Sequence, residues 1–115
     1  MLRLKGHDMP NKSAPVDLIH LSRRTAGDRA LEREVLGLFV RQCDLYLHRF
    51  HHAPDGEAKR VAAHALVGSA RAVGAFDLAD AAGTVERDPL ADCGTLDREV
   101  HAASSYVAEL LQDAH

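Results

Sequence analysis

Tryptophan is absent from this sequence, and aromatic residues make up only 4% of its 115 residues. The core must therefore come from Ala, Leu and Val. Such short side chains suit closely packed helices better than sheets, which favour aromatic and β-branched residues. No apolar run approaches the ~20 residues that cross a bilayer, and residues 1–8 lack the apolar stretch of a secretory signal. We expect a cytoplasmic, all-α protein without a membrane segment.

An excess of positive charge is also missing, and cysteines are few. The formal net charge is −3, which argues against nucleic acid as a partner because binding a phosphate backbone requires a basic excess. Cys43 and Cys93 lie far apart and form no C-x-x-C pair. A disulfide framework is therefore not expected, and two reduced thiols fit a cytoplasmic protein.

Helical periodicity runs through most of the chain. Residues 1–14 show no period, and we expect a flexible N-terminal tail there. Turn and capping signals divide the remainder, among them Asp28, Pro54-Asp55-Gly56, Gly74 and Asp88-Pro89. The predicted helices cover residues 15–24, 29–51, 57–73, 76–87 and 95–112. The sequence therefore predicts one domain over residues 15–115, an antiparallel four-helix bundle with an additional short N-terminal helix.

The helix predicted for residues 57–73 has a polar side that core packing does not explain. At about 100° per residue, the predicted core face is centred about 130° away from His64. That face comprises Ala58, Ala62, Ala65, Ser69, Ala72, Val73 and Phe76. We therefore expect the His64 imidazole to face solvent in mid-helix, with Arg60 and Arg71 one and two turns away.

Gly68 stands one turn after His64 on the same polar side. A glycine inside a helix costs about 1 kcal/mol relative to alanine, and no core packing requires it there. One interpretation is that Gly68 leaves the imidazole accessible to a large partner. The other is that Gly68 only lets a helix pack, and that His64 is one surface histidine among eight.

The segment from His64 to Ala75, HALVGSARAVGA, resembles the signature of histidine phosphotransfer (HPt) domains. That signature has Leu two residues after a histidine, Gly four and Ser five residues after it, and Gly-Ala at the end of the helix. The resemblance extends over roughly residues 15–112. It implies that His64 accepts a phosphoryl group from an aspartyl phosphate and that Gly68 is the small residue that admits the receiver domain.

Val67 departs from the family, which usually has Lys there, close to the phosphoryl oxygens. Arg60 and Arg71 would supply cationic donors instead, unless they are ordinary surface charges. We expect Val67 to be exposed, in an apolar docking patch that includes part of the helix at 29–51.

The resemblance implies which partners the chain has, and that it has neither a cofactor nor a kinase activity of its own. The partners would be the receiver domains of a hybrid histidine kinase and of a response regulator, and the receiver would supply Mg²⁺. The chain would be a monomeric phosphoryl carrier that needs no cofactor. It contains no G-x-x-x-x-G-K-[ST] loop, so we expect no ATP-dependent kinase activity of its own. An unperturbed histidine has a pKa of about 6.5, which makes an imidazole a competent nucleophile near neutral pH.

Two other functions stay open at this point. The bundle would also suit a module that docks on a kinase or receiver domain and regulates it without accepting phosphate, which Val67 in place of Lys favours. Alternatively, His48, His51 and His52 would present imidazoles to a metal ion near a helix end. No Cys or carboxylate joins these histidines in the sequence, and they also suit the negative end of a helix dipole. We therefore expect no metal site.

Overall fold

The computed structural model describes residues 14–113, and every regular element among them is a helix. In chain order these are α3 (Leu18–Arg24), α4 (Arg29–His51), α5 (Gly56–Val73), α6 (Phe76–Arg87) and α7 (Gly94–Asp113). The predicted all-α bundle with a short N-terminal helix is confirmed. The predicted tail, apart from its last residue, lies outside the described residues. None of the described helices is long and apolar enough to span a membrane.

Aspartates placed just before the helices set where three of them begin. Asp28 accepts a hydrogen bond from the Leu31 amide at the start of α4, as predicted, and Asp55 accepts one from the Ala58 amide at the start of α5. These bonds satisfy amides that have no partner within the helix. Asp17 caps α3 in the same way. The short helix therefore begins at Leu18, later than the predicted start at residue 15.

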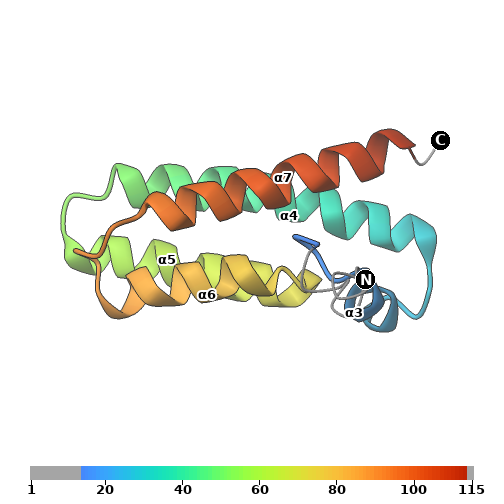
Figure 1. Ribbon diagram of the computed structural model, residues 1–115, viewed down its shortest axis with the longest axis horizontal. Coiled ribbons are helices and arrows are strands. Elements are labelled where there is room, and N and C mark those ends of the chain that lie inside the picture. The colour runs from blue at the N-terminus through green and yellow to red at the C-terminus, as the bar shows by residue number, and fades with distance from the viewer. Residues whose placement is uncertain (1–13, 114–115) are drawn as a thin grey trace, which may run out of the picture.

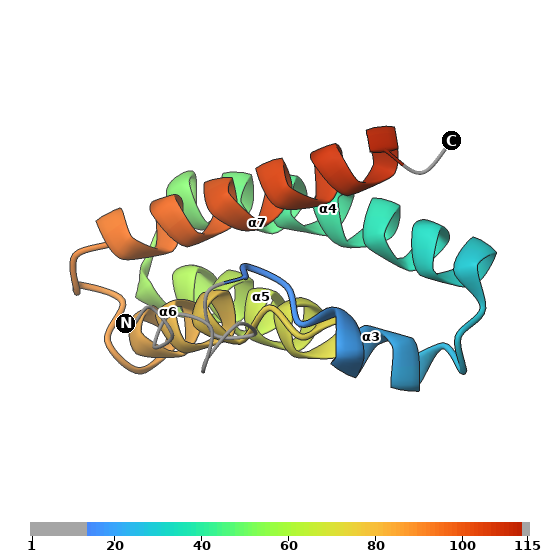
Figure 2. The ribbon, with the colours of Figure 1, turned by 45° about the vertical axis from the view of Figure 1, so that its right-hand side comes forward.

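The four longer helices form a closed ring in which each packs against its two neighbours (Figure 1). The chain reverses direction at each connection, so α4 pairs with α5, α5 with α6, α6 with α7, and α7 with α4. The short helix α3 lies beside the end of α5 (Figure 2). The largest fully buried side chains are Phe39, Phe50, Leu21, Leu66, Leu78, Leu96, Val16, Val73, Val85, Val107 and Cys43.

The buried face of α5 differs from the predicted one. Ala62 and Val73 are buried as expected, but Ala72 is exposed, and Phe76 belongs to α6 and is also exposed. The buried residues of α5 are Ala62, Ala63, Leu66, Val67, Ala70 and Val73. On a helical wheel, the centre of this set lies about 90° from the predicted centre. The difference arises because α5 packs against both α4 and α6, and because its alanines spread over about half of the helix circumference.

Gly74 forms the contact between the end of α5 and the segment that precedes α3. It ends α5 in the left-handed region, with φ of 83°, and its carbonyl accepts a hydrogen bond of 2.9 Å from the Asp17 amide. A Cβ on Gly74 would lie 3.0 Å from the Asp17 carbonyl oxygen and 3.2 Å from the His20 Cβ. Glycine is therefore required both by the backbone conformation and by the close approach of the two segments.

We predict that Gly74→Ala lowers the free energy of unfolding by roughly 1–2 kcal/mol, the cost of placing a side chain in the left-handed region. Gly68→Ala is the matched control, because a Cβ at Gly68 meets nothing within 4 Å. That variant should be as stable as the wild type or more stable, since it removes the cost of glycine in a helix. Urea midpoints at constant m-value measure both effects. An unchanged midpoint for Gly74→Ala would show that this junction tolerates a side chain.

Candidate functional site

His64 lies in the middle of α5, and its side chain is 75% exposed. The predicted exposure is therefore confirmed. Its Nδ1 lies 2.8 Å from the Glu86 Oε2 on α6. A carboxylate only accepts hydrogen bonds, so the proton between these two atoms belongs to Nδ1. In the neutral imidazole, the lone pair is then on Nε2, the nitrogen that Glu86 leaves free.

Glu86 contacts His64, although no motif in the sequence marks it as a site residue. It is separated from His64 by 22 positions, so no helical spacing within α5 reveals it. The sequence feature that could have revealed this contact is the tight connection between α5 and α6. In two antiparallel helices, residues equally far from the connection lie side by side, and His64 and Glu86 are each eleven residues from Ala75.

The two arginines predicted near His64 differ in what they contact. Arg60 donates a hydrogen bond of 2.7 Å to Glu57 Oε1 and one of 3.3 Å to the Glu86 carbonyl oxygen. The Arg71 side chain forms no hydrogen bond or ion pair with any residue that the structure describes. Arg60 is therefore partly neutralised and held against α6, whereas the charge of Arg71 is available to a partner.

Val67 is buried, with 7% of its surface accessible, so the prediction that it is exposed is wrong. Val67 follows Arg60 by two helical turns and lies on the same side of α5, the side that packs against α6. The prediction assumed a single buried stripe facing one neighbour. Because α5 contacts α4 and α6 at once, its buried face is wide enough to include position 67.

Exposed apolar side chains lie instead at different levels along the seam between α4 and α5. Val61 of α5 is 61% exposed, and Leu38 and Leu45 of α4 are exposed as well. Ser69 donates a hydrogen bond of 2.9 Å to Gln42 Oε1, which joins the two helices along this seam. On helical wheels, both leucines lie on the Gln42 side of α4, and Val61 lies between Ser69 and His64 on α5. We call Leu38, Leu45 and Val61 the seam patch.

The three histidines at the end of α4 do not converge. The rings of His48 and His52 stack with their centroids 4.1 Å apart, whereas His51 Nε2 lies 2.7 Å from Asp97 Oδ1 on α7. Among the described residues, these three imidazoles do not form a group with metal-binding spacing. The alternative of a three-histidine metal site therefore finds no support in the fold.

No family model matches this sequence, and comparisons with curated proteins and with solved structures find no match. The function of this chain is therefore inferred from its own residues and geometry.

We predict that Glu86 fixes the tautomer of His64. In ¹⁵N NMR spectra of the neutral ring, the wild type should show Nδ1 protonated and Nε2 unprotonated. Glu86→Ala should shift the population toward the Nε2-protonated form, because the acceptor for Nδ1–H is lost. Glu57→Ala is the control, since it removes a nearby carboxylate that contacts Arg60 and not His64. Identical spectra for the wild type and Glu86→Ala would contradict this role.

Proposed function

We propose that the protein is a histidine phosphotransfer carrier. His64 accepts a phosphoryl group from an aspartyl phosphate of one receiver domain and yields it to an aspartate of another. The observation that supports this best is the mid-helix imidazole that is exposed to solvent while its Nδ1 is held by Glu86. A histidine kept only for packing or solubility needs neither an oriented ring nor an open glycine one turn away.

In the proposed step, Nε2 of His64 attacks the phosphorus of the aspartyl phosphate in line. The N–P bond forms as the P–O bond to the aspartate breaks, and the aspartate leaves as a carboxylate with the electron pair. The ring keeps its proton on Nδ1 and gains positive charge. The Glu86 carboxylate faces that proton at 2.8 Å and stabilises the charge as it develops. The reverse reaction with a second receiver domain completes the relay.

Arg71 is the best candidate for the cation that the family usually supplies as Lys. It follows His64 by two turns, or about 10 Å along the helix axis. Side chains in a helix lean toward its N-terminus, so Arg71 leans toward Gly68 and His64, and the missing side chain at Gly68 leaves its path open. Arg60 precedes His64 and leans away from it, toward Glu57.

Val61 gives a receiver domain an apolar contact beside the imidazole, and Leu45 and Leu38 continue the seam patch away from it along α4. Gly68 and His64 lie on one side of Val61, and the two leucines of α4 lie on the other. A groove that includes Tyr46, Ala62 and Ala65 continues the same seam. In this proposal, the receiver domain carries Mg²⁺ and most of the charged groups, and phosphoryl transfer mainly needs positioning and charge neutralisation from both proteins. The chain acts in the cytoplasm as a monomer and has no ATP-dependent activity.

A second candidate function is docking on a receiver or kinase domain without accepting phosphate. The buried Val67 favours it, because the position where the family usually has Lys offers no cation here. Phosphate on His64 distinguishes the two functions.

We predict that incubation with phosphorylated receiver domains transfers one phosphate to the protein, in an acid-labile and alkali-stable bond, as expected for a phosphoramidate. His64→Gln should abolish the label, and ATP alone should give none. His101→Gln, which replaces another exposed histidine, is the control and should accept phosphate like the wild type. Label that survives acid, or that persists in His64→Gln, would exclude His64 as the site. Binding without label would favour the docking function.

We further predict that the seam patch and Gly68 govern access of the receiver domain. Val61→Asp should slow transfer by about tenfold or more, because a charge replaces an apolar contact worth about 1.4 kcal/mol. Gly68→Gln should slow transfer at least as much, since its side chain covers the imidazole.

Ile19→Asp is the control for both variants. It makes the same apolar-to-acidic change at an exposed residue of α3, beyond the far end of α5. Circular dichroism should show equal helix content in all three variants. Wild-type transfer rates in Val61→Asp and Gly68→Gln would mean that the receiver domain approaches from another side.

A further inference from the structure

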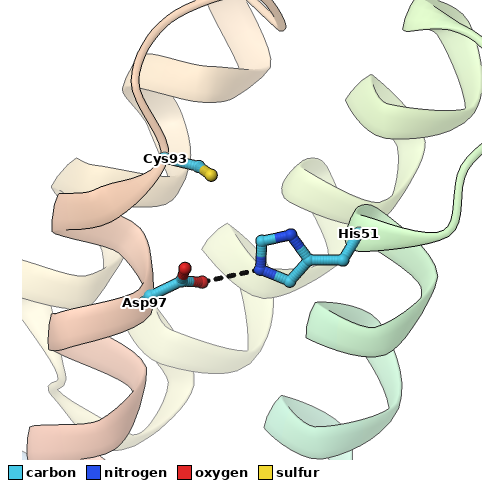
Figure 3. Close-up of side chains that lie close together, drawn as sticks. All are labelled: His51, Cys93 and Asp97. Atoms are coloured by element: carbon cyan, nitrogen blue, oxygen red, sulfur yellow. Dashed lines mark hydrogen bonds and ion pairs between the residues drawn. The ribbon is translucent and has the colours of Figure 1, made fainter.

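Three metal-ligating side chains of different types meet at one end of the bundle (Figure 3). His51 is the last residue of α4, Cys93 precedes α7, and Asp97 lies in the first turn of α7. The imidazole nitrogen, the thiol sulfur and a carboxylate oxygen all lie within 4.8 Å of one another. Figure 3 shows the imidazole and the carboxylate pointing toward each other, with the thiol directed into the same space.

Neighbouring contacts hold these groups in place. The Asp97 amide donates a hydrogen bond of 3.0 Å to the Cys93 carbonyl oxygen, so the two ligands on this side share one tight turn. Leu96, next to Asp97, is buried in the core. On the other side, the His51 ring packs edge-on against the buried Phe50 ring, with centroids 5.4 Å apart. The cluster is therefore supported by buried residues on both helices.

The chemistry of the three donors is selective. A thiolate and an imidazole are typical ligands of zinc, whereas magnesium and calcium prefer sites made of oxygen atoms. Zinc bonds of about 2.0–2.3 Å place tetrahedral ligands roughly 3.3–3.7 Å apart. His51 Nε2 and Asp97 Oδ1, now 2.7 Å apart, would separate by less than about 1 Å to admit the ion.

We propose that His51, Cys93 and Asp97 bind one zinc-type divalent ion, with water as the fourth ligand. The ion binds Nε2 of the neutral His51 ring, whose proton moves to Nδ1, and it replaces the thiol proton of Cys93. Binding therefore releases the thiol proton and strengthens as the pH rises. The two side chains of the ion pair are 36% and 46% exposed, so the ion enters directly from solvent. The bound ion links the end of α4 to the start of α7.

Cys93 is the thiol that this site uses. The other thiol, Cys43, is buried in the core, where burial, with a smaller effect of the Asp44 charge, raises its pKa to about 12. Cys43 therefore stays protonated at neutral pH and does not compete for the ion. This site shares no residue with the one around His64, and its test involves no phosphate.

The experiment is a titration of the reduced, chelator-treated full chain with Zn²⁺, followed by calorimetry, and with Co²⁺, followed by absorbance. We expect one ion per chain, together with a thiolate-to-cobalt charge-transfer band that grows with pH. Cys93→Ser should abolish the band. His51→Gln and Asp97→Asn should each raise the Kd for Zn²⁺ at least tenfold. At free Zn²⁺ about 100 times the Kd, the Tm should rise by roughly 10 °C.

The double variant His48→Gln/His52→Gln is the control, because it removes two neighbouring imidazoles that lie outside the cluster. It should bind Zn²⁺ like the wild type. Loss of binding in this control while Cys93→Ser still binds would overturn the proposal in favour of the histidines of α4. The absence of saturable binding to the wild type at one ion per chain would overturn it as well.

Discussion

The rotation of α5 about its own axis determines how the surface of this bundle is arranged. This helix packs between α4 and α6, and its buried alanines, Ala62, Ala63 and Ala70, let both neighbours approach closely. The larger Leu66 and Val73 fill the space between the helices. Burying one such side chain contributes about 1.5–3 kcal/mol, which is more than the cost of Gly68 in a helix. Core packing therefore sets the rotation, and the outward position of His64 follows from it.

The surroundings of His64 come from three helices once that rotation is set. α5 itself supplies Gly68 and Arg71, α6 supplies the carboxylate that orients the ring, and α4 supplies apolar side chains beyond Val61. In the proposed function the imidazole needs no cavity, because a receiver domain would cover it from outside. An exposed side chain also costs the fold little. The left-handed backbone and the close contacts that a side chain would disturb lie at the end of α5, at Gly74, ten residues from His64.

The cluster of His51, Cys93 and Asp97 has a different physical basis. It joins α4 and α7, whereas the contact between His64 and Glu86 joins α5 and α6. The two groups therefore lie on different pairs of helices in the ring. Each is positioned by the two helices that carry its residues. In one, a carboxylate orients a ring whose other nitrogen faces solvent. In the other, a carboxylate, an imidazole and a thiol converge. In the two proposals, histidine–carboxylate contacts would thus serve different chemistry according to what the fold brings beside them.

The sequence by itself determined the helices and the exposure of His64. The predicted boundaries of α4 and α6 agree with the structure, because capping aspartates, turns and prolines act within a few residues. The exposure of His64 was predictable because it lies about 130° or more from the centre of both the predicted and the observed core face of α5, so a core face misplaced by about 90° still leaves it outside. Only the tertiary structure decided the burial of Val67, the contact of Glu86 with His64, and the meeting of His51 with Cys93 and Asp97. Each of these depends on which side of a helix meets its neighbour. In a sequence rich in alanine, local periodicity leaves that rotation undetermined, and packing between helices distant in the chain determines it.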